Sequence, residues 1–375
     1  MKEMTSDELR KKLVSGERIA VVDIREADEY DDWHIHGSSN MPMYNAIVDG
    51  RVSTVVGELF EGFANDKPIV TVCRMGATSK VAAGVLGRMG YEAFSLTGGI
   101  RGWSNAWTEA EVPLESGTRL IQVRRNGKGC LSYVVGSAGK AAVVDPCLDA
   151  SVYTAIAERE GLKITSVIET HVHADHISRA RTLCETTGTD PCIPENQRVR
   201  YDYEALKDGQ TLKIGDTRVS VIMTPGHTTE SACYGIDGEV LLSGDTIFVE
   251  ALGRPDLERG DAGAEEGARL LYESLHEKVL KMDPTITVCP AHTGAPIGFD
   301  GEPVSAPLGD ITQGIHLLNM AKEEFIRVVP EMLGRKPPNF ERVISINEGR
   351  AELGYLDPLE LEAGPNRCAV GKPAP

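Results

Sequence analysis

A short segment near the middle of the chain crowds four potential metal ligands into six residues. It reads THVHADH over residues 170–176 and follows a β-branched run. Alternate residues of a strand point to the same side, so His171 and His173 project together. The loop that follows turns Asp175 and His176 toward the same point. A lone histidine is usually structural, but this clustering predicts a metal site.

Three later motifs add residues of the same kinds. TPGHT places His227 in a tight turn, SGDT places Asp245 after an expected strand, and PAH adds His292. Histidine and carboxylate side chains in loops at strand ends suit a hard or borderline transition metal. The sequence therefore predicts that a metal ion is bound by this part of the chain.

The surrounding pattern is one of consecutive strands mixed with helices. A chain of 375 residues suits two domains, and mixed β-meander and β-α pieces of this kind predict a layered α/β sandwich for the second one. The tail after Gly349 is punctuated by Pro and Gly, which predicts an extended wrap or loop. The expected strands are Leu120–Val123, Leu131–Val135, Ala141–Val144, Thr165–Glu169, Arg218–Met223 and Val240–Leu242, with helices at about Ala264–Leu280 and Ile311–Val328.

The first hundred residues follow a different rhythm, in which short β-branched runs alternate with amphipathic stretches. This alternation predicts a small parallel α/β sheet. An acidic stretch containing Pro113 then predicts a linker over residues 111–117. The expected domains are 1–110 and 118–375. The strands expected in the first are Ile19–Ile24, Ile69–Cys73 and Ala93–Leu96, with a helix at Ser79–Met89.

Charge and composition exclude several classes of function. The net charge of −17 repels phosphate backbones, so nucleic acid is excluded as a partner. No apolar run is long enough to span a bilayer, and the first residues do not form a signal peptide, so a cytoplasmic protein without a membrane partner is expected. The eight cysteines form no CxxC pair, which favours reduced thiols.

One cysteine lies where a parallel sheet places its ligands. Cys73 follows an expected buried strand, and Gly76 allows a turn before the next helix. Backbone N–H groups of such a turn stabilise a thiolate, and Arg74 and Lys80 would lower its pKa further. This pattern favours a nucleophile. The alternative is a buried structural cysteine at a strand end.

The residues around Cys73 resemble the rhodanese homology domain across nearly all of residues 5–110. The resemblance implies that Cys73 accepts a sulfane sulfur and passes it to a thiol, with Arg74, Gly76 and Thr78 in the catalytic loop. Trp33 stands where the family usually has glycine, and Thr78 where arginine is frequent in thiosulfate-using members, so the sulfur donor stays open. The matching stretches are VDIRE at 22–26, Glu29-Tyr30, His34-Ile35, Gly37-Ser38, NMP at 40–42 and LTGGIRGW at 96–103.

These four metal motifs, in this order, resemble the metallo-β-lactamase superfamily over roughly residues 118–300. Most members are two-zinc hydrolases in which all these histidines bind metal. The persulfide dioxygenases keep the same residues and bind one Fe²⁺ per chain through two histidines and one aspartate. By motif match these ligands are His171, His227 and Asp245. In that case His173, Asp175, His176 and His292 orient the ligands; in a two-zinc enzyme they hold the second metal.

Three features favour iron. The segment GRPD at 253–256 resembles the dioxygenases and offers Arg254 and Asp256 as substrate-binding residues, although an ion pair inside the loop is the alternative. Asn366-Arg367-Cys368 loosely resembles their C-terminal end. The neighbouring rhodanese-like part would make persulfide, which is their substrate. Ala251-Leu252 replaces the Gly-Cys of many members.

Together these observations predict an α/β protein with a small rhodanese-like domain followed by an αββα sandwich. The leading hypothesis is a sulfurtransferase with a Cys73 persulfide, coupled to oxidation of a small thiol persulfide, such as glutathione persulfide, by O₂ to sulfite and thiol. Thiosulfate or sulfite is a further small-molecule partner, and a homo-oligomer is compatible with the sequence. The alternatives are a two-zinc thioester hydrolase of the glyoxalase II kind fused to a sulfurtransferase, and a sulfide sensor without catalysis.

Overall fold

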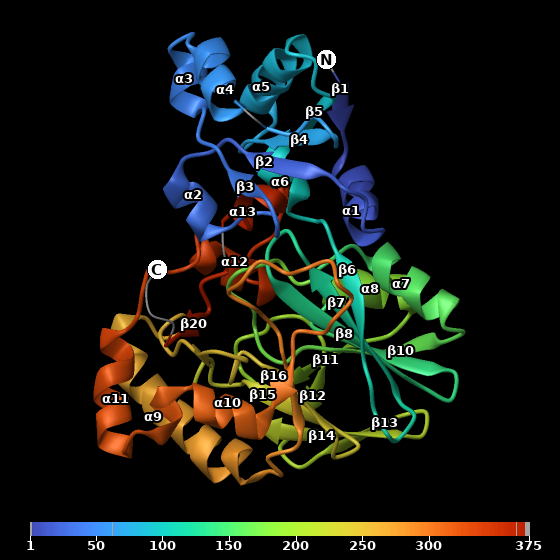
Figure 1. The fold of residues 1–375 in the computed structure, drawn as a ribbon. Coiled ribbons are helices and arrows are strands. Elements are labelled where there is room, and N and C mark those ends of the chain that lie inside the picture. Colours follow the sequence, from blue (N-terminus) through green and yellow to red (C-terminus); the bar gives the residue numbers. More distant parts are fainter. Residues whose placement is uncertain (1, 62, 365, 372–375) are drawn as a thin grey trace.

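A computed structural model, which describes residues 2–61, 63–364 and 366–371, divides the chain into an N-terminal sheet and a larger two-sheet sandwich (Figure 1). The N-terminal sheet has five parallel strands in the order β1-β5-β4-β2-β3. Its strands are β1 (Lys2–Met4), β2 (Ala20–Asp23), β3 (Ser39–Asn40), β4 (Ile69–Val72) and β5 (Ala93–Leu96).

Helices cover both faces of this sheet, so its central strands are buried and apolar, as in other parallel sheets. Strand β4, with the sequence IVTV, is buried at every position. The first helix begins at a capping box, in which Thr5 and Glu8 satisfy free backbone N–H groups. The helices are α1 (Ser6–Val14), α2 (Ala27–Asp32), α3 (Tyr44–Val48), α4 (Val52–Leu59), α5 (Ala77–Arg88) and α6 (Gly99–Trp103).

The larger part packs a seven-stranded sheet against a six-stranded sheet, with helices on the outer faces. The first sheet runs β12-β11-β10-β9-β8-β7-β6 and the second β13-β14-β15-β16-β18-β19. Their strands are β6 (Thr108–Val112), β7 (Arg119–Arg125), β8 (Cys130–Ser137), β9 (Lys140–Val144), β10 (Lys163–Ile168), β11 (Pro191–Pro194), β12 (Glu204–Leu206), β13 (Thr211–Ile214), β14 (Thr217–Met223), β15 (Ala232–Ile236), β16 (Val240–Gly244), β18 (Thr287–Pro290) and β19 (Ala306–Pro307).

The core between these sheets explains their strand patterns. In β14 every second residue from Thr217 to Val221 is buried, which is the pattern of a strand with one face on a core. The expected αββα sandwich is therefore confirmed. The remaining elements are α7 (Ala150–Arg159), α8 (Ala180–Thr187), η1 (Asp261–Gly263), α9 (Ala264–Glu277), η2 (Val279–Lys281), α10 (Leu308–Gly314), η3 (His316–Asn319), α11 (Lys322–Glu331), α12 (Phe340–Asn347) and α13 (Pro358–Leu361), and the paired strands β17 (Leu252–Gly253) and β20 (Ala369–Val370).

Two expected elements differ from the structure. The linker predicted over 111–117 begins inside β6, because Thr108–Val112 pairs with Leu120–Arg124 of β7. The single helix expected over Ile311–Val328 is broken into α10, η3 and α11. The break falls at Gly314 and at Ile315, whose backbone is extended. Residues 372–375, the end of the second expected domain, lie outside the described residues.

The two parts meet through a buried arginine and aromatic contacts. Arg125 is fully buried, and its guanidinium donates to the Ser104 carbonyl at 2.8 Å and to Asn105 Oδ1 at 2.8 Å. The rings of Trp103 and Phe299 meet edge to face, 6.2 Å between centroids. Figure 1 shows α13 between the N-terminal sheet and the sandwich, where Arg101 pairs with Asp357 at 2.5 Å.

Trp33 makes a further contact between the two parts. Its indole lies against Gly129, where an added Cβ would be only 2.8 Å from the ring. Gly129 also has a φ of +86°, which favours glycine. Only glycine therefore lets the Trp33 ring approach this backbone. Within the described part of the chain, no helix has the length and apolar character that a bilayer crossing needs.

Candidate active sites

Cys73 lies immediately after β4, in the turn that leads into α5. The thiol is buried, and its sulfur accepts hydrogen bonds from the Gly76 N–H at 3.1 Å and from Ser79 Oγ at 3.3 Å. Burial by itself would raise the pKa of Cys73, but hydrogen bonds from Ser79, Thr78 and backbone N–H groups outweigh it and lower the pKa. The turn is therefore built to stabilise a thiolate or persulfide anion.

Glycines make this turn possible. Gly76 has a φ of +86°, and an added Cβ would lie 2.9 Å from the Gly98 nitrogen. Gly99 fits against the turn so closely that a Cβ would lie 2.1 Å from the Cys73 carbonyl oxygen. The LTGGIRGW stretch thus packs directly on the cysteine turn, and the Ile100 N–H donates to that carbonyl at 2.8 Å.

The two basic residues near Cys73, Arg74 and Lys80, were expected to lower its pKa, and their positions do not support this. Lys80 forms an ion pair with Glu3, 2.9 Å from Nζ to Oε1. Arg74 is exposed at the mouth of a cavity of about 300 Å³ that Cys73 and Thr78 also line. The hydrogen-bond donors of the turn, Thr78 among them, rather than these cations, stabilise the anion.

The predicted metal ligands meet where strands of both sheets end. His171 follows β10, His227 follows β14, and Asp245 follows β16. All three are buried, and Asp245 Oδ2 lies 3.7 Å from His171 Nε2 and 3.5 Å from His227 Nε2. These three atoms lack a hydrogen-bond partner among the described residues. Buried polar atoms without partners that converge on one point fit a metal ion.

The opposite side of each histidine ring is held in place. Thr170 Oγ1 donates to Asp145 and lies 2.9 Å from His171 Nδ1, so Nδ1–H donates to Thr170. The Arg254 carbonyl accepts from His227 Nδ1 at 2.7 Å. Both Nε2 atoms therefore carry the lone pair that a metal needs. Burial and the neighbouring histidines lower the pKa of His171 well below its ordinary value, which keeps the ring neutral.

The four other predicted residues surround this triad. His292 Nδ1 lies 2.6 Å from Asp245 Oδ1, and its Nε2 lies 3.0 Å from Asp175 Oδ2. His176 Nδ1 lies 3.0 Å from Asp175 Oδ1. Burial alone would lower the pKa of His292, but the carboxylates of Asp175 and Asp245 outweigh it and raise the pKa to about 10. Cys130, which the sequence did not single out, joins Asp175, His176 and His292 within 4.8 Å.

His173 forms a separate group with two carboxylates. Its Nε2 lies 3.0 Å from Glu169 Oε2 and 3.3 Å from Asp145 Oδ1. Its Nδ1 has no hydrogen-bond partner among the described residues. Burial opposes protonation here, yet Asp145 and Glu169 raise the pKa of His173 well above its ordinary value. These two carboxylates could not be recognised in the sequence, because they lack motif spacing.

Arg254 and Asp256 form a buried ion pair instead of facing a cavity. Arg254 donates to both oxygens of Asp256, at 2.7 and 3.0 Å, and to the carbonyls of Gly334, Arg335 and Arg367. These five bonds occupy the five N–H donors of a guanidinium, so none remains for a substrate. The predicted substrate contact through Arg254 is therefore corrected. The pair fixes the loop whose carbonyl orients His227.

The C-terminal segment holds the loop that carries the predicted metal ligands. Asn347 Nδ2 donates to the carbonyls of His173 and His176, each at 2.8 Å. Glu362 accepts from the Ile177 N–H at 2.9 Å and from Arg125 at 2.7 Å. Neither residue could be recognised from the sequence, because the partners of both lie far away in the chain.

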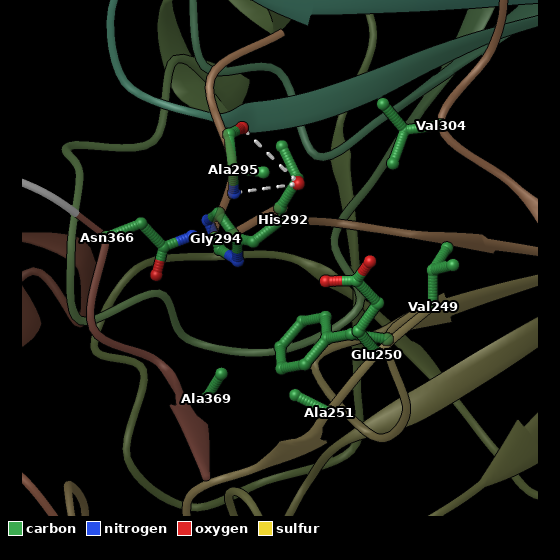
Figure 2. A pocket seen from close by; sticks show the side chains of 11 residues that line it. Val249, Glu250, Ala251, His292, Gly294, Ala295, Val304, Asn366 and Ala369 are labelled. Carbon is green, nitrogen blue, oxygen red and sulfur yellow. Dashed lines mark hydrogen bonds between the residues drawn. The ribbon is translucent and has the colours of Figure 1, made fainter. Parts of the chain in front are cut away.

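A small, mostly apolar cavity of about 110 Å³ leads to His292. Figure 2 shows Asn366 and Glu250 facing this cavity from opposite sides, with Ala251 and Ala369 at its base. Its volume is below the usual range for a whole ligand, so it accommodates only the end of a slim molecule. This cavity opens beside the predicted metal triad because His292 contacts Asp245.

Comparisons with known proteins agree with this division. The Rhodanese-like domain family matches residues 5–106, and the metallo-beta-lactamase superfamily matches residues 125–292. The chain is 26% identical to the mitochondrial persulfide dioxygenase ETHE1 of Bos taurus over 234 residues, 61% of this chain and 87% of that protein. It is 37% identical to a hydroxyacylglutathione hydrolase of Rhizobium johnstonii over 119 residues, 31% of this chain and 46% of that protein.

A solved structure supports the fold of the larger part. ETHE1 from Myxococcus xanthus matches with a TM-score of 0.55 at 23% identity, over 62% of this chain and 98% of that chain. At this identity the likeness shows the fold alone. The cysteine turn, the buried cluster of histidines and carboxylates and the two family matches lead to one conclusion. The chain is an enzyme that joins a Rhodanese-like domain to a metal-binding domain of the metallo-beta-lactamase superfamily.

Proposed function

We propose that the chain transfers sulfane sulfur through Cys73 and oxidises a low-molecular-weight thiol persulfide with O₂ at a single non-heme iron. The overall oxidation consumes one persulfide RSSH, one O₂ and one water, and yields RSH, sulfite and two protons. The chain combines a Rhodanese-like domain with a second domain that is similar to a protein named persulfide dioxygenase. This combination supports the same substrate class for both domains.

The observation that carries the proposal is the convergence of His171 Nε2, His227 Nε2 and Asp245 Oδ2. Two histidines and one carboxylate are the donor set of non-heme iron oxygenases. Bound there, Fe²⁺ would supply open coordination positions at which a persulfide sulfur and O₂ are brought together. The unpartnered state of all three atoms supports this assignment.

The surrounding residues would position the ligands and limit access. His292 holds Asp245 through Oδ1 and leaves Oδ2 for the metal. The cavity beside His292 has mostly apolar walls, including Phe248 and Ala251. Its small volume would admit the sulfur end of a persulfide while the rest of the carrier stays outside.

A two-zinc thioester hydrolase is the second candidate, and specific atoms favour it. His173 Nδ1 and His176 Nε2 are buried and have no hydrogen-bond partner among the described residues. Cys130, Asp175, His176 and His292 could hold a second metal. The similarity to a protein named hydroxyacylglutathione hydrolase also supports this candidate. The number and identity of bound metal ions separate the two candidates.

The test combines metal analysis with oxygen uptake. Protein purified without added metal is expected to contain one iron per chain, and iron-loaded protein to consume O₂ when glutathione persulfide is added. Asp245→Ala should lose iron and oxygen uptake together, since it removes a charged ligand. Asp310→Ala, which removes an exposed carboxylate in the first turn of α10, is the control.

Two results would contradict the proposal. The first is an absence of oxygen uptake by iron-loaded protein together with thioester hydrolysis by zinc-loaded protein, which would establish the second candidate. The second is full retention of iron in Asp245→Ala, which would show that the ligand triad is misassigned.

A further inference from the structure

A cavity of about 600 Å³ lies between the two domains, and both contribute to its wall. This volume is within the range of small-molecule sites. The Rhodanese-like side supplies Glu29, Trp33 and Arg74, and the metal-binding side supplies Lys128 and the C-terminal segment at 359–364.

The interdomain cavity adjoins the smaller cavity that contains Cys73. Both are lined by Arg25, Glu29, Arg74 and Met75. Arg74 and Met75 directly follow Cys73 in the chain and are exposed. A molecule in the interdomain cavity therefore lies next to the cysteine turn and can reach its sulfur from the side of the metal-binding domain.

Lys128 brings an unpaired positive charge to the wall. The residue is 3% exposed, and its Nζ donates to the carbonyls of Glu362 at 2.9 Å and Gly364 at 3.3 Å. No carboxylate of the described residues lies within 4 Å of Nζ. An ammonium has three donors, so one N–H is left over. A buried cation without a counter-ion is costly, and an anionic ligand would remove that cost.

The other charges of the wall are mostly neutralised by the protein itself. Two more groups at the junction of the cavities have no side-chain partner in the described part of the chain: the guanidinium of Arg74 and the carboxylate of Glu29. The cavity thus offers two free cations and one free anion. The internally paired groups are Arg25 with Asp23, Asp32 with Arg367, Arg101 with Asp357 and Glu360, and Glu362 with Arg125.

We propose that the interdomain cavity binds the acceptor of the Cys73 sulfur, an amino-acid-derived thiol that carries carboxylates and an ammonium group. Lys128 and Arg74 bind the carboxylates, and Glu29 binds the ammonium. The inference rests on the proposed sulfur transfer at Cys73 and goes beyond it, because it makes the metal-binding domain part of the acceptor site.

The transfer step itself needs no further reactant. The acceptor thiol loses its proton to solvent, and its thiolate attacks the outer sulfur of the Cys73 persulfide. A new S–S bond forms to the acceptor, the bond between Cys73 Sγ and that outer sulfur breaks, and its electron pair stays on Sγ. The Gly76 N–H and Ser79 hydroxyl stabilise the thiolate that is released.

The test separates the two half-reactions in the full-length chain. Loading of Cys73 by thiosulfate or inorganic polysulfide is followed by intact-mass spectrometry as the gain of one sulfur. Discharge is then measured with three thiols: glutathione, which has carboxylates and an ammonium group, 3-mercaptopropionate, which has only a carboxylate, and uncharged 2-mercaptoethanol.

Lys128→Met is expected to raise the KM for glutathione and 3-mercaptopropionate about tenfold, the usual effect of losing one charge-assisted hydrogen bond. Discharge by uncharged 2-mercaptoethanol should change much less than discharge by the two carboxylate-bearing thiols, because this thiol has no carboxylate for Lys128 to bind. Arg74→Gln, at an exposed position where folding is not at risk, should act in the same direction. Glu29→Gln should raise the KM for glutathione alone, because glutathione is the one of the three thiols that carries an ammonium group. Lys140→Met, which changes an exposed lysine of β9, is the matched control.

Several outcomes would overturn the inference. If Lys128→Met and Arg74→Gln slow loading by thiosulfate but leave discharge intact, the cavity serves the donor. If both variants discharge all three thiols like the wild type, the acceptor binds elsewhere. A wild-type protein whose Cys73 accepts no sulfur from either donor would instead refute the proposed sulfur transfer itself.

Discussion

At the scale of single residues, the chemistry of Cys73 depends on groups that touch its sulfur and not on the nearby cations. Ser79 is fully buried, donates to Cys73 Sγ at 3.3 Å and contacts Ser95 Oγ at 2.8 Å. A hydroxyl fixed at both ends loses little entropy when it stabilises a thiolate. Ser79 is therefore a positioning residue for the nucleophile.

Ser79→Ala should raise the pKa of Cys73, because a donor to the thiolate is lost while burial continues to disfavour the charge. The rate of Cys73 alkylation, followed against pH, should shift to higher pH by up to about one unit. Ser53→Ala, at an exposed position in α4, is the control. An unchanged profile would mean that the backbone N–H groups alone hold the anion.

Residues inside compact motifs could be found from the sequence, and residues that act across the fold could not. The segment 170–176 and Cys73 are recognisable because their local spacing already sets up the chemistry. The choice between substrate binding and an ion pair for Arg254 could not be made from the sequence, since its partners at Gly334, Arg335 and Arg367 come together only in the folded chain. Lys128 gave no signal for the same reason.

At the scale of elements, the segment after α11 connects the loop at residues 171–177 to the domain boundary through buried hydrogen bonds and ion pairs. Helix α12 supplies Asn347, and the turn after α13 supplies Glu362, which is buried. Burial by itself would raise the pKa of Glu362, but Arg125 and Arg179 outweigh it and lower the pKa to about 2. The tail expected as a wrap or loop is thus held by buried charges.

Glu362→Gln should destabilise the protein at pH 7 by about 3 kcal/mol, because it leaves Arg125 buried without its counter-ion. In an unfolded chain a glutamate has a pKa of about 4.3. A folded pKa lowered to about 2 means that the ion pair stabilises fully above about pH 5 and is lost as the pH falls toward 2. The midpoint of thermal unfolding should therefore differ most between wild type and variant at neutral pH.

Glu360→Gln is the matched control in the same segment. Its side chain is 66% exposed and pairs with Arg101 at 3.1 Å, so its removal should change stability by less than about 1 kcal/mol. An equal loss in both variants, or a Glu362→Gln effect that does not shrink at low pH, would contradict this role of Glu362.

Elements with strong local patterns were predictable, and those defined by packing were not. The strand Ala93–Leu96 was predicted at its observed bounds. Strand β6 was hidden because its acidic residues Glu109 and Glu111 suggest a linker, while Thr108, Ala110 and Val112 face the sheet core. The helix break near Gly314 was missed because the apolar periodicity continues through it.

At the scale of the whole molecule, the two sites share a chain but no side chains. The cavity of Cys73 is lined by residues 24–78, and the cavity at His292 by residues 248–369. Cys73→Ser should therefore abolish sulfur loading and leave oxygen uptake with pre-formed glutathione persulfide at the wild-type rate. Loss of both activities in this variant, with its fold intact by circular dichroism, would show that the sites are not independent.

The contact between Trp33 and Gly129 makes the domain boundary a fixed joint. Gly129 directly precedes Cys130, which forms a β-bridge with His292. The Trp33 ring of the Rhodanese-like domain therefore contacts the backbone of the other domain beside the predicted metal-binding residues. Arg125 is buried at the same boundary and bonds to Ser104 and Asn105, so movement of the Cys73 domain toward the metal site would break these contacts. In the proposed function, a small thiol therefore has to take up the sulfur at Cys73, leave that site and bind again at the metal site.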